Sequence, residues 1–369
     1  MILLSDRLPP ENIYKNLKHW NTHNGSANDT LYKIHPSISY SKTYKKPIKH
    51  RGCRYPNRVK GGYLTVIPNG RIWGRNGAII TPDNKLIWEV SSEFVKTPWE
   101  HSIFKQETLP PVTEYYDLAA DLTHRLSHNY YHWMFEVIPR FHLIETCFTH
   151  IDKFIVTLPE KILPFQEETL AAIGIPLPHL VKTHDQFHIK AEKLVVPSQP
   201  SMATKWASNY LRAKFLSENN IDNTNKNRIY IRRTHYRRVL NEEELITVLK
   251  EYGFIPVELE TMSVSDQVNL FSGAECIIAP HGAGLTNIVF CDPGTKIIEI
   301  FPPAYVRAYY SIISSFGNLD YHYIIGTPGG RDDICDEILL NNDWNGYENV
   351  TVNINTFEKA LLKAGIDKG

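Results

Sequence analysis

The chain lacks a long apolar run, an excess of charge of either sign and paired cysteines. Each of these absences disfavours a class of protein. No stretch reaches the apolar length that a membrane span needs, and residues 1–7 lack the basic and apolar regions of a signal peptide. The 40 Lys and Arg balance 40 Asp and Glu, so no overall field attracts a nucleic acid. The five cysteines form no CxxC pair, which disfavours a structural zinc site or a disulfide framework. We therefore predict a reduced, cytoplasmic protein with no nucleic-acid partner.

What remains is an ordinary globular composition, 42% hydrophobic and 22% charged, over 369 residues, which is enough for two domains. Residues 1–60 are polar, basic and rich in Tyr, Asn and Pro, and we interpret them as an irregular arm. Short strand-like runs divided by turns at Pro68-Asn69-Gly70 and Pro82-Asp83-Asn84 predict a β-meander over 61–95. An α/β part over 112–200 completes the predicted N-terminal domain, 1–200.

Strand-like and helical segments alternate through residues 201–350, which we predict to form a second domain. Its strand-like runs are 228–231, 254–257, 276–278 and 296–300. Such alternation is typical of a doubly wound parallel sheet, so the fold class is α/β. Residues 351–369 contain an amphipathic helix over 357–363, which we expect to pack back on the N-terminal domain.

The most informative motif is the turn over 281–287. It follows a short apolar strand and precedes the apolar residues 288–290. A strand that breaks at glycines and restarts as a helix offers backbone N–H groups to an anion, most often a phosphate. The alternative is a tight strand-to-helix connection without a ligand. We take the whole turn as a candidate phosphate site, comprising His281, Gly282, Ala283, Gly284, Leu285, Thr286 and Asn287.

Five arginines between 228 and 238 end one strand and enter a loop. Guanidinium groups match phosphate geometry in a bidentate way, and open α/β sheets bind ligands at strand ends. We therefore predict that Arg232, Arg233 and Arg238 bind a diphosphate. The alternative is a solvated basic loop.

Carboxylates supply two further expectations for the second domain. Glu258 and Glu260 follow the next strand, where a carboxylate can accept hydrogen bonds from a ribose diol, although both can equally be surface acids. No aspartate pair of the DxD kind is well placed to hold a metal on a diphosphate, since Asp332-Asp333 lies in a late loop. We therefore expect no metal.

A helix predicted from His128 to Cys147 carries one polar stripe on a largely apolar surface. Its members, at spacings of three and four, are Asn129, His132, Glu136 and Arg140. A buried helix directs such a stripe at partners or at a cleft. His132 can act as a general base with Glu136 orienting it, or Glu136 can be the base itself. The alternative is an internal hydrogen-bonded network. Pro139 is expected to kink the helix or mark its end.

Together these motifs resemble glycosyltransferase family 61. The resemblance covers roughly residues 120–300 and rests on the ordered set Asn129–Trp133, Glu136, Pro139-Arg140, Arg232-Arg233, Arg238, Asn241–Glu243, Asp266-Gln267 and His281–Asn287. It implies a GT-B architecture, in which two Rossmann-like domains face a cleft. In this chain we expect an N-terminal β-meander as an extension of that fold. The resemblance also implies an inverting, metal-independent transfer of a sugar from a nucleotide donor, expected to be a UDP-sugar, to a hydroxyl group.

For this chain, the resemblance implies that Glu136 or His132 takes the acceptor proton, with Asn129 and Arg140 on the acceptor side. The arginines and the turn would stabilise the leaving diphosphate, and no cofactor beyond the donor is expected. Without an anchor, the chain looks like the bacterial members that build capsule or other surface polysaccharides. We accordingly expect a glycan or lipid-linked glycan acceptor, and a cytoplasmic location with at most peripheral membrane contact. The alternative is a non-catalytic nucleotide- or carbohydrate-binding protein.

Overall fold

The computed structural model describes residues 4–24, 31–39, 47–50, 53–91, 93–200, 202–217, 226–330 and 345–368. The chain divides into two compact units: Met1–Ile38 with Val59–Met202 form unit 1, and Ser39–Arg58 with Ala203–Gly369 form unit 2. The pair Asp332-Asp333 lies outside the described residues. None of the helices described is long and apolar enough to cross a membrane.

Part of the predicted N-terminal arm belongs to unit 2. The Tyr55 hydroxyl lies 2.7 Å from Ser311 Oγ, and the Lys49 backbone N–H donates to the Tyr323 hydroxyl at 3.2 Å. These contacts attach the described residues 47–50 and 53–58 to the second unit, whereas the sequence had placed them with the first. The polar composition of the segment gave no sign of this because these two contacts, one from a backbone N–H and one from a single side chain, leave no periodic pattern in the sequence.

Unit 1 contains, among its described residues, a nine-stranded mixed sheet in the order β1-β7-β6-β5-β11-β8-β9-β10, with β2 also paired to β5. The strands β5, β6 and β7 are antiparallel neighbours, as the predicted meander requires, while β11, β8, β9 and β10 are parallel. Their bounds are β1 Asn12–Tyr14, β2 Leu31–Lys33, β5 Tyr63–Trp73, β6 Ala78–Ile80, β7 Lys85–Ile87, β8 Glu114–Asp121, β9 Lys153–Val156, β10 Leu180–Lys182 and β11 His188–Pro197.

The turn predicted at Pro68-Asn69-Gly70 lies inside β5 instead. Pro68 pairs with Lys193 and Gly70 with Ala191 across the antiparallel ladder with β11. Asn69 takes the left-handed φ of 52° that asparagine tolerates. A Cβ on Gly70 would lie 2.8 Å from Leu194 Cβ, so the glycine here allows close packing between strands. The turn-like residues therefore mark an irregular, tightly packed strand.

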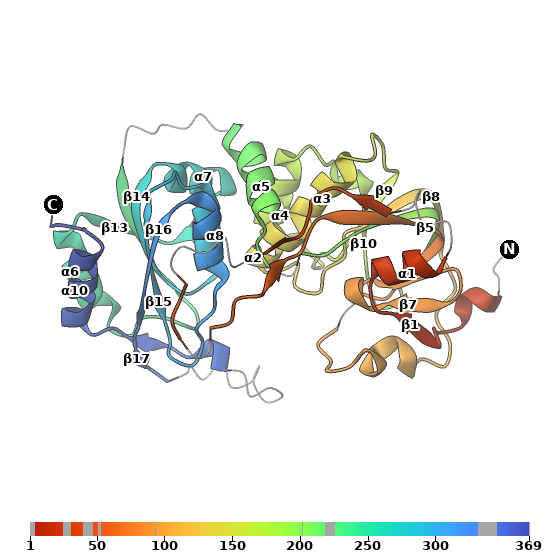
Figure 1. Ribbon diagram of the computed structural model, residues 1–369, viewed down its shortest axis with the longest axis horizontal. Helices are drawn as coiled ribbons and strands as arrows, with labels where there is room; N and C mark the ends of the chain where they lie inside the picture. Colours follow the sequence, from red (N-terminus) through yellow and green to blue (C-terminus); the bar gives the residue numbers. More distant parts are fainter. Residues whose placement is uncertain are drawn as a thin grey trace. The chain divides into compact units, whose positions relative to one another are not determined.

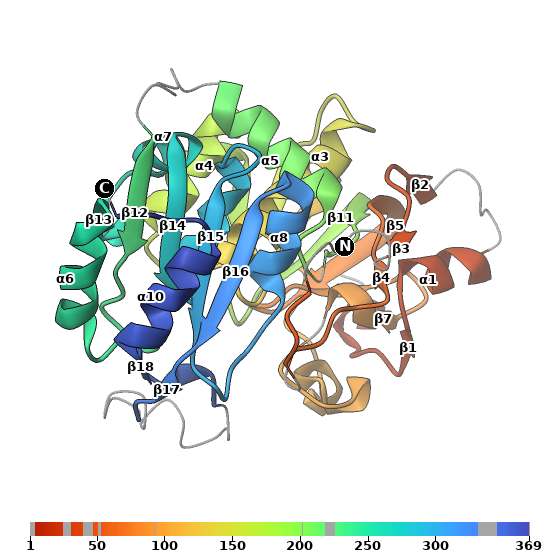
Figure 2. The ribbon, with the colours of Figure 1, turned by 60° about the vertical axis from the view of Figure 1, so that its left-hand side comes forward.

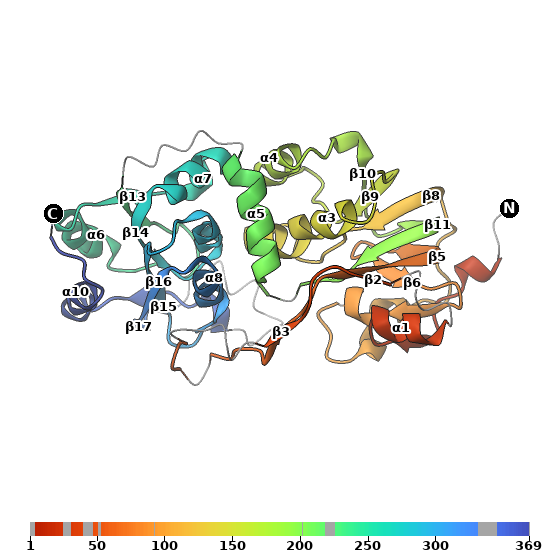
Figure 3. The ribbon, with the colours of Figure 1, turned by 45° about the horizontal axis from the view of Figure 1, so that its top comes forward.

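Helices cover both faces of this sheet. Figures 1 and 3 show α3 (Ile138–Glu145) and α4 (Pro164–Ala172) on one face and α1 (Leu17–His23) on the other. In α1, Leu17 and Trp20 are buried in one cluster with Ile67 and Leu194 of the sheet. The remaining short helices of unit 1 are η1 Leu4–Arg7, η3 Trp88–Val90, η4 Pro98–Glu100, η5 Ser102–Lys105, α2 Tyr130–His132, the π-helix η6 Trp133–Val137 and η7 Leu177–His179.

Unit 2 is built on the predicted parallel sheet, with strand order β13-β12-β14-β15-β16. Figure 2 shows β12, β14, β15 and β16 side by side. The chain goes from β12 to one neighbour, β13, and then crosses to the other side, so the order reverses between β12 and β14. Open α/β sheets bind ligands outside the carboxyl ends of the strands at such a switch point. The bounds are β12 Asn227–Ile231, β13 Phe254–Val257, β14 Ala274–Pro280, β15 Lys296–Phe301 and β16 Asp320–Ile325.

Helices lie on both faces of this second sheet as well. Figure 3 shows α6 (Glu242–Glu251) and α10 (Ile354–Lys363) on one face, and α5 (Lys205–Ser217), α7 (Val264–Ser272) and α8 (Tyr309–Gly317) on the other. The shorter elements of unit 2 are η8 Leu259–Thr261, η9 Ala283–Phe290, η10 Asn345–Tyr347 and the small antiparallel pair β17 Thr327–Pro328 and β18 Val350–Thr351. A further two-stranded sheet is formed by β3 (Ile38–Ser39) and β4 (Arg58–Val59).

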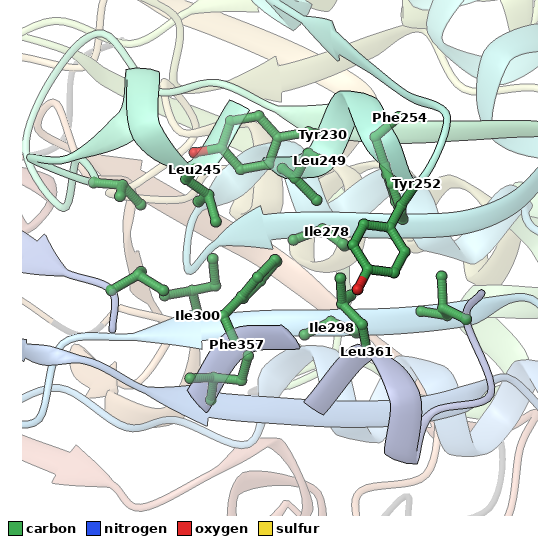
Figure 4. Packing of buried hydrophobic residues seen from close by; sticks show 14 of the residues in the cluster. Tyr230, Leu245, Leu249, Tyr252, Phe254, Ile278, Ile298, Ile300, Phe357 and Leu361 are labelled. Atoms are coloured by element: carbon green, nitrogen blue, oxygen red, sulfur yellow. The ribbon is translucent and has the colours of Figure 1, made fainter. Parts of the chain in front are cut away.

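The terminal helix packs on its own unit, so the prediction that it returns to the N-terminal domain is wrong. Phe357 and Leu361, four residues apart on one face of α10, are fully buried in the cluster that contains Leu249 and Ile298 (Figure 4). Val350, in the strand β18 just before the helix, is buried in the same cluster. The apolar face was predictable from its period, but the surface that it covers depends on the tertiary fold.

We expect Leu361→Ala to lower the free energy of unfolding by at least about 2 kcal/mol, because a large buried side chain leaves a cavity when it is truncated. Leu362→Ala, on the next residue of the same helix, is the matched control, since its side chain is 61% exposed. Urea denaturation measures both values. Equal effects of the two substitutions would contradict the packing of α10.

Candidate functional site

Two motifs recognised separately in the sequence meet at the switch point of unit 2. Arg233 follows the end of β12, and Gly282 follows the end of β14. A Cβ on Gly282 would overlap the Nη1 atom of Arg233. The backbone of Gly282 is extended, with φ of 176°, so glycine is needed here for close approach rather than for an unusual conformation. The arginine-rich strand end and the glycine turn therefore form one site.

Two further arginines bring positive charge to the same place. The guanidinium of Arg237 lies 5.3 Å and that of Arg307 4.3 Å from the centre of the Tyr305 ring. Burial, together with the neighbouring charge of Arg237, lowers the pKa of Arg233 to about 10. Within the described part of the chain, none of these three guanidinium groups forms an ion pair with a carboxylate. Three guanidinium groups gathered at the carboxyl ends of the strands, at the switch point, suit an anion.

His281 lies buried beside these arginines and is held by Glu299. Its Nδ1 atom is hydrogen-bonded to the Glu299 carboxylate, which also accepts from the Tyr321 hydroxyl at 2.6 Å. Burial, followed by the charges of Arg237, Arg233 and Arg307, lowers the pKa of His281 well below its usual value. Burial also raises the pKa of Glu299. His281 is therefore a neutral imidazole with one ring nitrogen fixed.

Arg232 points away from this site, which corrects its predicted role. Its Nε and Nη2 atoms donate to Glu242 at 3.0 and 2.9 Å, and Nη1 lies 3.5 Å from Glu258 Oε1. Strand alternation places Arg232 on the face opposite Arg233, where it meets the acidic first turn of α6. The predicted ribose ligand Glu258 is thus paired with Arg232, while Glu260 is exposed and near enough to Arg233 to raise its pKa.

The second half of the glycine turn is internal structure. The helix that follows, η9, is a 3₁₀-helix whose Leu285, Thr286 and Asn287 are buried. Asn287 Nδ2 donates to Gln267 Oε1 at 2.7 Å, which connects η9 to α7. Ala283 and Gly284 are half-buried and form the part of the turn open to a ligand. The Arg238 backbone N–H donates to Asn349 Oδ1 at 2.9 Å, next to β18.

In unit 1, the predicted helix over 128–147 is divided into three pieces. Asn129 caps α2, its Oδ1 accepting from the Tyr131 N–H at 3.0 Å, so its role is in helix initiation. The π-helix η6 follows and then α3. Pro139 has no N–H and cannot bond the carbonyl four residues earlier, and a π-turn is one way to absorb that missing bond. Such π-turns are frequent at functional sites.

The π-helix presents Glu136 to two histidines. Its Oε2 atom lies 2.6 Å from His132 Nδ1 and 2.9 Å from His124 Nε2. The Leu126 backbone N–H donates to His124 Nδ1 at 3.2 Å, which assigns the proton of neutral His124 to Nε2. His132 correspondingly donates Nδ1–H to Glu136 and keeps a lone pair on Nε2. The His132 side chain is 24% exposed and that of Glu136 only 7%.

The charge state of Glu136 follows from the same contacts. Burial alone would raise the pKa of this carboxyl, but hydrogen bonds from His124 and His132 outweigh burial and lower the pKa to about 2. Glu136 is therefore ionised at neutral pH. A buried carboxylate with so low a pKa is a poor base but a good partner for an imidazole.

His124, His132 and Glu136 offer ligand atoms within 4.8 Å of one another, as a metal site would require. A histidine that binds a metal through Nε2 needs its lone pair there and its proton on Nδ1. The Leu126 N–H that points at His124 Nδ1 requires the opposite tautomer. The donor set therefore fits a hydrogen-bonded triad and does not fit a metal site.

Arg140 is structural, contrary to its predicted place on the acceptor side. Its side chain is fully buried, with Nη2 2.7 Å from Asp121 Oδ2 and Nη1 3.0 Å from the Thr123 carbonyl oxygen. For this residue the internal network, the alternative weighed from the sequence, is what the structure contains. Arg140 thereby ties α3 to the end of β8, three residues before His124.

Four residues of the two sites were not predicted from the sequence: His124, Glu299, Arg237 and Arg307. His124 follows the end of a parallel strand, a position that had drawn attention to Arg233 and His281. Arg237 lies within the arginine-rich run, but its neighbour Arg238 was predicted as the diphosphate ligand instead. Glu299 sits inside an apolar strand, where a carboxylate is itself a signal of a buried partner. Arg307 is isolated in the sequence and carried no signal.

Comparison with known proteins gives a family match over part of the chain. Residues 130–298 match the family model described as Glycosyltransferase 61. The match contains His132, Glu136, Arg233 and His281, and it excludes His124. The chain is therefore similar to this family over the segment that carries most of both candidate sites, in agreement with the resemblance found from the motifs.

Individual relatives are similar over shorter stretches. A beta-1,2-xylosyltransferase of Oryza sativa is 36% identical over 87 residues, 23% of this chain and 16% of the relative. One of Arabidopsis thaliana is 37% identical over 98 residues, 23% and 18% of the two chains. A protein O-linked-mannose beta-1,4-N-acetylglucosaminyltransferase 2 of Takifugu rubripes is 34% identical over 98 residues, 25% and 17%. The chain spans less than a fifth of the length of these relatives, which are plant and animal enzymes and give no support to the bacterial, capsule-building type.

Proposed function

We propose that this protein is an inverting, metal-independent glycosyltransferase that moves a sugar from a nucleotide donor, a UDP-sugar, to a hydroxyl of a glycan acceptor. One observation carries the proposal: Gly282 leaves the space that Arg233 occupies at the switch point of a parallel sheet, within the segment similar to family 61. The names of the similar proteins, which are sugar transferases, support the same class of reaction. The GT-B architecture, the cytoplasmic location and the surface-polysaccharide role stay predictions.

On the donor side, the proposal assigns the diphosphate to unit 2. Arg233, Arg237 and Arg307 supply positive charge, and the half-buried part of the turn at Ala283 and Gly284 lets a ligand approach the backbone. A departing nucleoside diphosphate gains negative charge as its bond to the sugar breaks, and fixed cations stabilise that charge without a metal. His281 lies among these groups and is held by Glu299.

On the acceptor side, the proposal assigns proton removal to His132 in unit 1. The acceptor oxygen forms a bond to the anomeric carbon while the bond from that carbon to the diphosphate oxygen breaks, with inversion. The hydroxyl proton passes to Nε2 of His132, the partly exposed ring nitrogen that keeps a lone pair. Glu136 accepts the Nδ1–H at 2.6 Å and stabilises the imidazolium that forms.

A thermal-shift series with UDP-, GDP- and CMP-sugars tests the donor half of the proposal. A ligand at 100 times its Kd adds about 2.7 kcal/mol to the stability of the native state, so a UDP-sugar is expected to raise Tm measurably. Release of UDP on addition of glycan acceptors tests the transfer. No shift with any nucleotide sugar would overturn the proposal, while a shift without turnover across a broad acceptor panel would favour a non-catalytic binding protein.

A further inference from the structure

We propose that His124 is a positioning residue for this transfer: it shares one oxygen of Glu136 with His132 and so holds the carboxylate in the orientation that His132 needs. The inference rests on the proposed function for its catalytic meaning. The arrangement itself is a property of unit 1 and can be tested without any substrate.

The geometry makes His124 a donor of fixed direction. The Leu126 N–H occupies its Nδ1 at 3.2 Å, which leaves Nε2–H to donate to Glu136 Oε2 at 2.9 Å. The His124 and His132 rings are stacked, with centroids 5.6 Å apart and planes 24° from parallel. Both imidazoles therefore converge on one carboxylate oxygen from neighbouring positions. A carboxylate that accepts two such hydrogen bonds has little freedom to rotate away from His132.

The backbone on both sides of this contact is tied together. Arg140, in the helix that continues from Glu136, donates to the carbonyl of Thr123, the residue before His124, at 3.0 Å. Its ion pair with Asp121 fixes the end of β8 two residues earlier. The loop that carries His124 and the helix that carries Glu136 therefore move as one piece. Such an arrangement suits a group whose role is orientation.

Several charged groups face the triad and set its response to pH. Arg125 attracts the negative charge of Glu136, and Arg140 disfavours a proton on His124. Burial, followed by the charge of His132, lowers the pKa of His128. Without the His124 N–H, the charge of Glu136 is less compensated. Uptake of a proton by the His132–Glu136 pair then becomes easier, so the acid limb of the pH–rate profile moves to higher pH.

The test compares His124→Leu with His124→Gln in the full chain. Glutamine can place an N–H near the position of the histidine Nε2, whereas leucine fills similar space without a donor. For His124→Leu we expect kcat to fall by 10- to 100-fold, KM for the donor to stay within about threefold, and the acid limb to rise by about one pH unit. His124→Gln is expected to recover most of kcat and the original limb. Equal kcat and an unmoved limb in both variants would overturn the inference.

A second measurement keeps this test independent of the transferase assignment. Carbon-13 NMR of labelled glutamate carboxyls follows the ionisation of Glu136 in the free protein, with Glu136→Gln to assign the signal. Its pKa, lowered to about 2 in the wild type, is expected to rise in His124→Leu and to stay low in His124→Gln. An unchanged Glu136 titration in folded His124→Leu would overturn the positioning role. A shifted titration in a protein without transferase activity would instead count against the proposed function alone.

Discussion

Replacing His132 by alanine is expected to lower kcat for sugar transfer by about 10³-fold, while KM for the nucleotide sugar changes by less than about threefold. His132 Nε2 is the lone-pair nitrogen of the triad and its side chain is 24% exposed, so it is the group able to meet an acceptor hydroxyl. Its loss is expected to remove proton transfer from the transition state while leaving the proposed donor-binding residues of unit 2 unchanged. Steady-state rates of UDP release at saturating acceptor measure the effect.

Two variants sharpen this expectation. His128→Ala removes an exposed imidazole that lies four residues earlier in the chain and outside the hydrogen-bonded triad, so it is expected to keep near wild-type kcat at neutral pH. Glu136→Gln keeps an oxygen that can accept from His132 Nδ1 but removes the charge that stabilises the imidazolium, so a loss of about 10²-fold is expected. Full turnover by His132→Ala together with inactive Glu136→Gln would contradict the assignment and make Glu136 the base.

The polar stripe of the first domain was predictable because spacings of three and four place residues on one helix face. What the stripe does was not predictable from spacing. Arg140 lies on the same stripe as Glu136, yet it is buried in an ion pair with Asp121, at the carboxyl end of β8. His124 joins the site from that strand end, and a π-turn in the helix adjusts the face on which Glu136 lies. These features depend on tertiary contacts and on a local change of helical period.

The parallel sheet of unit 2 was predictable for a related reason: short apolar runs alternating with amphipathic helices have few other ways to bury both faces. Strand alternation also places the side chains of Arg232 and Arg233 on opposite faces. It does not predict which face contains acidic partners, because Glu242 and Glu243 reach Arg232 only when α6 packs beside β12. The same holds for the terminal helix. Its apolar face was predictable from the sequence, but the sequence did not indicate that this face packs on the sheet of its own unit.

The placement of Arg232 and Arg233 on opposite faces of the strand end leads to the second large expected effect. Arg233→Ala is expected to weaken UDP-sugar binding by about 10²-fold or more, because a guanidinium at the switch point donates charge-assisted hydrogen bonds to a diphosphate. Arg232→Ala is the matched control, one residue away in the same strand end. The Arg232 guanidinium is hydrogen-bonded to Glu242 and lies within ion-pair distance of Glu258. Removing this side chain is therefore expected to lower Tm, while Kd for the donor stays within about threefold. Isothermal titration calorimetry measures Kd for both variants.

Gly282→Ala tests the same site while leaving every arginine in place. The added methyl group occupies the position of Arg233 Nη1, so the guanidinium has to turn away and donor affinity is expected to fall nearly as far as in Arg233→Ala. The double variant should then be little worse than either single one, because both changes remove the same interaction. Gly284→Ala, whose Cβ would lie 3.0 Å from the end of the Leu259 side chain and would not overlap an arginine, is expected to lower donor affinity much less. Wild-type affinity in Gly282→Ala would mean that Arg233 does not bind the donor from this position, and the link between the glycine turn and the arginine strand end would be lost.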